Sequence, residues 1–134
     1  MPILKNSSRQ ELITAFVDFT YADIPTNAAV YDALDLPANA IVSGGDLVVT
    51  TAWNSTTATL SVGDASSATR YTPAVDLKTA GRTALTLTGF THTNTEKVLK
   101  GTNAITGTAT AGAARLTVQY YVKGRTTFAQ GLGA

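Results

Sequence analysis

Side chains that could act as an acid, a base or a nucleophile are scarce in this sequence. The chain of 134 residues contains no cysteine and a single histidine, His92. A catalytic serine needs a neighbouring base, and no Gly-x-Ser-x-Gly motif is present to expose such a serine. His92 follows Phe90 and Thr91 at the expected end of a strand, where a lone histidine is usually a surface or capping residue. We therefore predict that the protein is not an enzyme.

The sequence is equally poor in residues for metal and carboxylate chemistry. Without cysteine and with one histidine, thiolate sites and multi-histidine sites are excluded. The closest acidic pair, Asp32 and Asp35, fits a solvated turn better than a glycosidase pair. The loop of Asp64, Ser66 and Ser67 is the one stretch that offers calcium several oxygens at short spacing. We predict no metal and no cofactor.

Aromatic residues offer the remaining surface chemistry. A sugar-binding platform needs exposed, stacked rings. Six residues come into question: Trp53, Tyr71, Phe90, Tyr120, Tyr121 and Phe128. Trp53 lies on an alternating strand and is predicted to belong to the core instead. Tyr121 falls on the outward, polar face of the last strand, and it is predicted to be an interface residue because interfaces are enriched in aromatic side chains.

Composition and charge narrow the class of protein. Apolar residues make up 44% of the chain, charged residues 14%, and the net charge is +1. This balance is unlike that of a disordered segment, and it lacks the surplus of basic residues that phosphate binding requires, so no nucleic-acid partner is expected. No apolar run is long enough for a signal peptide or a membrane span, so we expect no membrane partner and synthesis in the cytoplasm. A single domain with its own core is expected at this length.

The pattern of apolar residues indicates strands. Threonine, a β-branched residue suited to strands, occurs 24 times. Apolar and polar residues alternate with a period of two at 11–21, 57–62 and 114–123, which indicates strands with one buried face. In the first of these the odd-numbered residues are predicted to face inward. Leu12 and Phe16 remain on the other face, where they could form a second buried surface against another subunit.

The intervening segments are less regular. Residues 28–36 could begin a short helix but are assigned to a strand, and Gly44–Gly45 is expected to be a turn or a bulge before a strong strand at 47–54. Pro73 excludes a central strand from the irregular stretch 63–80. Four further expectations are a helical turn at 74–81 ending at Gly81, a strand at 84–91 with Leu85 and Leu87 inward, a short edge strand at 96–99, and a small-residue loop at 101–112.

Seven or eight short strands with regular turn signals predict an all-β, antiparallel sandwich or barrel. We assign a jelly roll of about eight strands, which periodicity alone does not separate from an immunoglobulin-like sandwich. The domain is placed at 11–124, between an N-terminal arm at 1–10 and a C-terminal tail at 125–134, which are either frayed termini or extended arms that bind a neighbour. The predicted interface residues are Ile3, Leu4, Arg9, Leu12, Phe16, Tyr121 and Phe128.

Three segments, taken in order and spacing, resemble a known family. Leu36–Val49, Asn54–Asp64 and Thr110–Tyr120 are similar to segments of the head decoration, or cement, proteins of tailed bacteriophages. The resemblance covers about residues 11–125. It implies a jelly roll on the outer surface of the virion, made in the host cytoplasm and bound as a homodimer or homotrimer between major capsid protein subunits. It carries over no catalytic residue.

Two other functions stay open from the sequence. A tail or fibre module of the virion would need the same rigid β-domain, and a carbohydrate-binding β-sandwich would need Trp53 exposed in the free protein. The cement role suits the composition best, because a protein that binds only the assembled shell stabilises it without any chemistry.

Overall fold

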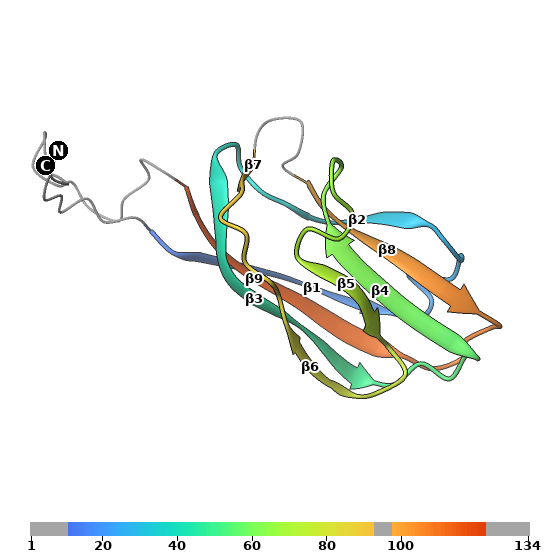
Figure 1. Ribbon diagram of the computed structural model, residues 1–134. Coiled ribbons are helices and arrows are strands. Elements are labelled where there is room, and N and C mark those ends of the chain that lie inside the picture. The colour runs from blue at the N-terminus through green and yellow to red at the C-terminus, as the bar shows by residue number, and fades with distance from the viewer. Residues whose placement is uncertain (1–10, 93–97, 123–134) are drawn as a thin grey trace, which may run out of the picture.

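The chain forms two antiparallel β-sheets packed face to face (Figure 1). The computed structural model describes residues 11–92 and 98–122. The strands are β1 (Ile13–Thr20), β2 (Val30–Asp35), β3 (Ala40–Thr51), β4 (Thr57–Gly63), β5 (Thr72–Asp76), β6 (Gly81–Ala84), β7 (Thr91–His92), β8 (Val98–Thr106) and β9 (Ala113–Val122). The described residues include no helix, and hence none long and apolar enough to cross a membrane.

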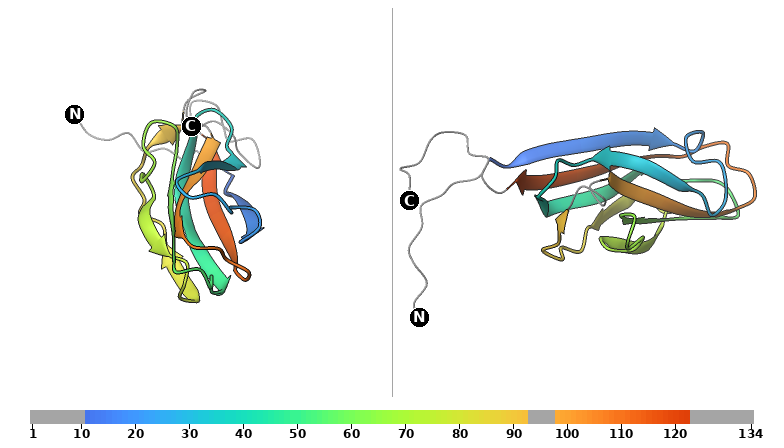
Figure 2. Two further views of the ribbon diagram at one scale, coloured as in Figure 1. Left: turned by 90° about the vertical axis from the view of Figure 1, so that its right-hand side faces the viewer. Right: turned by 90° about the horizontal axis from the view of Figure 1, so that it is seen from above.

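The strand pairing is nested. β1 pairs with β9, β2 with β8, β3 with β6 and β7, and β4 with β5. The two halves of the chain therefore run as an antiparallel ribbon, and this ribbon wraps so that the sheets have the orders β1-β9-β3-β6 and β2-β8-β4-β5. Figure 2 shows the two layers from the end and from above. This is the topology of a jelly roll, and the predicted fold class is confirmed.

The strands with a clean period of two form as predicted. β1 turns its odd-numbered residues inward and exposes the even-numbered ones. β9 buries Leu116, Val118 and Tyr120. β2 is a strand, as preferred over a helix. β3 is one continuous strand of 12 residues, and its register with β9 shifts between Val42 and Gly44, so the glycine pair is a bulge rather than a turn.

Two expectations for the middle of the chain are wrong. Residues 74–81 contain no helical turn: Thr72–Asp76 is β5 and Gly81 begins β6. β5 is an edge strand, which tolerates the missing N–H of Pro73, and it buries Val75. The strand expected at 84–91 is also wrong, because β6 ends at Ala84; Leu85 is buried as predicted, whereas Leu87 is exposed.

The largest difference concerns β8. We predicted an edge strand at 96–99 and a loop at 101–112, but residues 98–106 form a strand between β2 and β4; residues 93–97 lie outside the described residues. Its inward positions alternate as in other strands, but Gly101 and Asn103 occupy two of them. Gly101 leaves room for Leu60, and the Asn103 side chain accepts a hydrogen bond from the Ala29 amide and donates one to the Ile24 carbonyl. Because these inward residues are small or polar, β8 lacks the alternation of apolar and polar residues that predicts a strand.

Candidate interaction surface

The outer face of β1 carries exposed apolar side chains. Leu12 is 57% exposed and Phe16 is 61% exposed. β1 pairs with β9 so that Ile13 lies opposite Tyr120, which places Leu12 beside the half-buried Tyr121. Phe16 and Tyr121 therefore lie on one face of two neighbouring strands, with Leu12 directly before β1. Their role in an interface stays a prediction.

A charged pair borders this apolar face. The Arg115 guanidinium donates a hydrogen bond to Asp18 at 2.9 Å, and its central carbon lies 5.8 Å from the centre of the Phe16 ring. A guanidinium at this distance is attracted to the face of an aromatic ring. Arg115 thus lies close to both the Phe16 ring and the Asp18 carboxylate on the outer face of the sheet. The other four predicted interface residues lie outside the described residues: Ile3, Leu4, Arg9 and Phe128.

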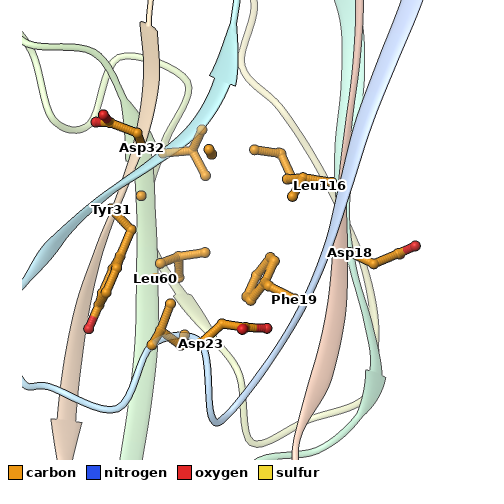
Figure 3. Close-up of a pocket in the computed structure, with 12 residues that line it drawn as sticks. Asp18, Phe19, Asp23, Tyr31, Asp32, Leu60 and Leu116 are labelled. Atoms are coloured by element: carbon orange, nitrogen blue, oxygen red, sulfur yellow. The ribbon is translucent and has the colours of Figure 1, made fainter.

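A slot opens between the edge strands of the two sheets, β1 and β2. It has a volume of about 290 Å³. Figure 3 shows Phe19, Leu60 and Leu116 pointing into it, so its floor is apolar. Three aspartates lie at its rim, Asp18, Asp23 and Asp32, and Figure 3 shows the Asp18 and Asp32 side chains directed away from the slot. The sequence did not predict this slot, because its walls come from segments far apart in the chain.

The three carboxylates differ in their partners. Asp18 pairs with Arg115, and Asp32 accepts a hydrogen bond from Lys100 at 2.5 Å. Asp23 accepts hydrogen bonds from the backbone amide and the hydroxyl of Thr20. Within residues 11–92 and 98–122, Asp23 is the one carboxylate of the three with no ion pair.

A polar cluster is buried at the other side of the sandwich. His92 is 0% exposed, so the expectation of a surface or capping histidine is wrong. The Tyr71 hydroxyl and His92 Nε2 are 2.5 Å apart and share a hydrogen bond, and the Phe90 ring meets the His92 ring edge-on. Asp64 Oδ2 lies 3.9 Å from His92 Nδ1. Residues distant in the sequence bury His92, so the residues next to it in the sequence do not indicate this burial.

Arg70 neutralises the carboxylate in this cluster. It donates a hydrogen bond to Asp64 at 2.5 Å, and its guanidinium stacks on Phe90 at 3.5 Å. Burial alone would raise the pKa of Asp64, but hydrogen bonds from Arg70 and from the amides of Ser67 and Ser66 outweigh it, so the pKa lies below its ordinary value. The carboxylate is occupied by its own loop and by Arg70, which leaves it poorly suited to the calcium considered from the sequence.

The remaining sequence candidates are placed as follows. No group of three or more acidic, histidine or cysteine side chains in the described part of the chain could hold a metal ion. Asp32 is exposed and engaged with Lys100, and Asp35 is exposed. Trp53 is 2% exposed, so the prediction that it belongs to the core is confirmed. A sugar platform on an exposed Trp53 is thereby excluded.

The buried tyrosine should make stability depend on alkaline pH. Burial first, and the Asp64 charge second, raise the pKa of Tyr71 from 10.0 to about 12. Because the unfolded chain ionises near 10 and the folded chain later, this contribution to stability is complete below pH 10 and is lost as the pH rises towards 12. Between pH 9 and pH 11 the loss should be about 1.4 kcal/mol. Urea unfolding should show this loss of stability in the unaltered protein and not in Tyr71→Phe. Equal losses in both proteins would contradict the raised pKa of Tyr71.

Comparisons with known proteins include a likeness to a chain of a phage capsid. No family model and no curated protein matches the chain. A chain in the solved structure of the cyanophage Pam1 capsid asymmetric unit superposes with a TM-score of 0.65 at 26% sequence identity, covering 91% of this chain and 92% of that one. A chain from a structure of Bacillus endospore appendages, described as disulfide-linked pili, reaches a TM-score of 0.48 at 13% identity, which is too low to carry an argument.

The fold and the first likeness define the class. A jelly roll with an exposed apolar sheet face, similar along nearly its whole length to a chain of a cyanophage capsid, supports a structural protein of a phage virion.

Proposed function

We propose that this protein binds the outside of a phage capsid and stabilises the contacts between major capsid protein subunits, as a decoration or cement protein does. The observation that carries the proposal is the fold shared with a chain of the cyanophage Pam1 capsid asymmetric unit over 91% of this chain. The order and spacing of Leu36–Val49, Asn54–Asp64 and Thr110–Tyr120, which resemble decoration proteins, support the finer role. The proposal includes self-association into a dimer or trimer, and no catalysis, nucleic-acid binding or membrane binding.

The outer face of β1 suits such a contact. Leu12 and Phe16 together present apolar surface that a shell protein could cover, and burial of a side chain of this size is worth about 1.5–3 kcal/mol. A protein that binds the assembled shell but not its free subunits shifts the equilibrium towards the shell. Many copies on one shell add their contributions, so each contact can be modest.

The test uses expanded, empty heads of the phage whose genome encodes the chain. We expect saturating protein to raise the temperature at which the heads rupture, and a reconstruction to show added density on the outside of the shell. Leu12→Ser and Phe16→Ser should each weaken binding about tenfold or more, because each loses the burial of one apolar side chain.

Leu87→Ser is the matched control. Leu87 is 49% exposed and follows β6, at the edge of the sheet opposite to β1. This variant should bind as the unaltered protein does. An unchanged rupture temperature with no density on the shell would contradict the capsid role, and density on the tail would favour a tail module. Equal binding of Leu12→Ser and Leu87→Ser would exclude the β1 face as the contact.

A further inference from the structure

The slot between β1 and β2 combines three features that suit an extended, cationic segment. Its floor is apolar, with Phe19, Leu60 and Leu116 pointing inward (Figure 3). Asp23 stands at its border without an ion pair in the described part of the chain. β1 pairs only with β9 and β2 only with β8 among the described strands, so both bounding strands offer a free backbone edge. An added extended segment can hydrogen-bond to such an edge.

Charge is divided unevenly along the chain. Residues 11–122 contain all nine acidic side chains and six of the ten basic ones, which gives this part a net charge of −3. The four other basic side chains lie in the two terminal segments, which contain no acid. In the C-terminal segment Lys123 and Arg125 precede Phe128, so two cations and an aromatic ring lie within six residues. This composition complements a slot with an apolar floor and, at its border, the Asp23 carboxylate, which has no ion pair among the described residues.

We infer that the slot binds residues 123–134 of a second copy of this chain. Phe128 would lie on the apolar floor and Arg125 would pair with Asp23, because Asp18 and Asp32 are already paired with Arg115 and Lys100. The inference deepens the self-association included in the proposed function and rests on it, but it does not depend on capsid binding.

The position of the slot favours a second copy over the same copy. β9 ends beside the beginning of β1, whereas the slot is lined by residues 17–19, in the later half of β1. A segment of the same copy would have to reverse direction immediately after Val122 and run back along β1. The reversal would use residues 123–125, which carry the cations that would pair with Asp23. A neighbouring copy can present the whole segment in an extended form.

The test measures self-association of the full chain by sedimentation at a range of concentrations. We expect the unaltered protein to form an oligomer that dissociates as salt is raised, because exposed charge pairs are screened. Asp23→Asn and Phe128→Ser should each weaken association about tenfold or more, since one loses a charge-assisted hydrogen bond and the other a buried ring. A labelled peptide of residues 123–134 should bind Phe128→Ser, and bind the double variant Asp23→Asn/Phe128→Ser about tenfold more weakly.

Asp35→Asn is the matched control. Asp35 is an exposed aspartate on the same strand as Asp32 and does not line the slot. Its variant should associate as the unaltered protein does, and unchanged Trp53 emission should confirm that every variant is folded. A monomeric unaltered protein, or an oligomer that Asp23→Asn and Phe128→Ser leave intact, would overturn the inference. Head binding is measured separately, so loss of the capsid role alone leaves this result standing.

Discussion

Replacing Asp64 by asparagine is expected to lower the free energy of unfolding by about 3 kcal/mol, because removing one partner of a buried ion pair leaves the other charge uncompensated. The Asp64 side chain is fully buried and that of Arg70 is 17% exposed, which places the expected loss at the lower end for such pairs. Asparagine keeps the oxygen that accepts hydrogen bonds from the amides of Ser66 and Ser67. The loss therefore reports the ion pair with Arg70, that is, the charge and the hydrogen bond that Asp64 Oδ2 accepts, and urea unfolding at neutral pH measures it.

Asp46→Asn is the control, because it removes the charge from an exposed ion pair instead of a buried one. Asp46 pairs with Arg82 at 2.6 Å, but the Arg82 side chain is 62% exposed. An exposed pair contributes about 1 kcal/mol or less, so this variant should be nearly as stable as the unaltered protein. If both substitutions cost the same, the buried cluster of Asp64, Arg70, Tyr71 and His92 does not hold the fold together as described.

The same carboxylate should govern stability in acid. The pKa of Asp64 is below 3.8 in the folded protein, so its contribution is present above the unfolded value and is lost as the pH falls through the folded value. Asp64→Asn has no such group. Its free energy of unfolding should therefore fall less steeply below pH 4 than that of the unaltered protein.

The sequence predicts those strands whose inward positions are all apolar. β4 and β9 show the full alternation, and the Thr/Ala/Gly composition of β8 does not. Gly101 and Asn103 face inward on β8 because a neighbouring leucine and two backbone groups of a distant loop fill the space and satisfy the amide. These partners are distant in the sequence and meet β8 only in the folded protein. A local sequence pattern therefore does not predict them.

The candidate sites differ in the same way: a local pattern predicts the exposed residues near β1, whereas tertiary contacts form the slot and bury His92. Leu12 and Phe16 were predicted to be available because they are apolar residues on the polar face of an alternating strand, and that signal is local. The slot needs β1, the following turn and β2 together, and the burial of His92 needs the loop after β4. The uneven distribution of charge between residues 11–122 and the two terminal segments can be read from the sequence. Its link to self-association depends on the structure, which places Asp23 beside the slot without an ion pair in the described part of the chain.

Replacing Gly112 by alanine is expected to cost about 2 kcal/mol through a clash with the core. A Cβ at Gly112 would lie 2.5 Å from Cδ2 of the buried Trp53 ring, closer than any non-bonded carbon atoms approach. The ring is itself held in the core and packs against Phe19 at 6.1 Å between centroids. Either Trp53 or the start of β9 must move to accept the methyl group.

Gly81→Ala is the control that separates the cost in stability of this clash from that of backbone strain. Gly81 has a φ of 152° and Gly112 a φ of 154°, so an alanine is strained by a similar amount at both positions. A Cβ at Gly81 would meet nothing within 4 Å, and that variant should lose only about 1 kcal/mol. Trp53 is the single tryptophan, so its emission should shift in Gly112→Ala and stay unchanged in Gly81→Ala. Equal losses with unchanged emission in both would mean that Gly112 is required for its backbone alone, and that the packing of Trp53 against the turn before β9 contributes little to stability.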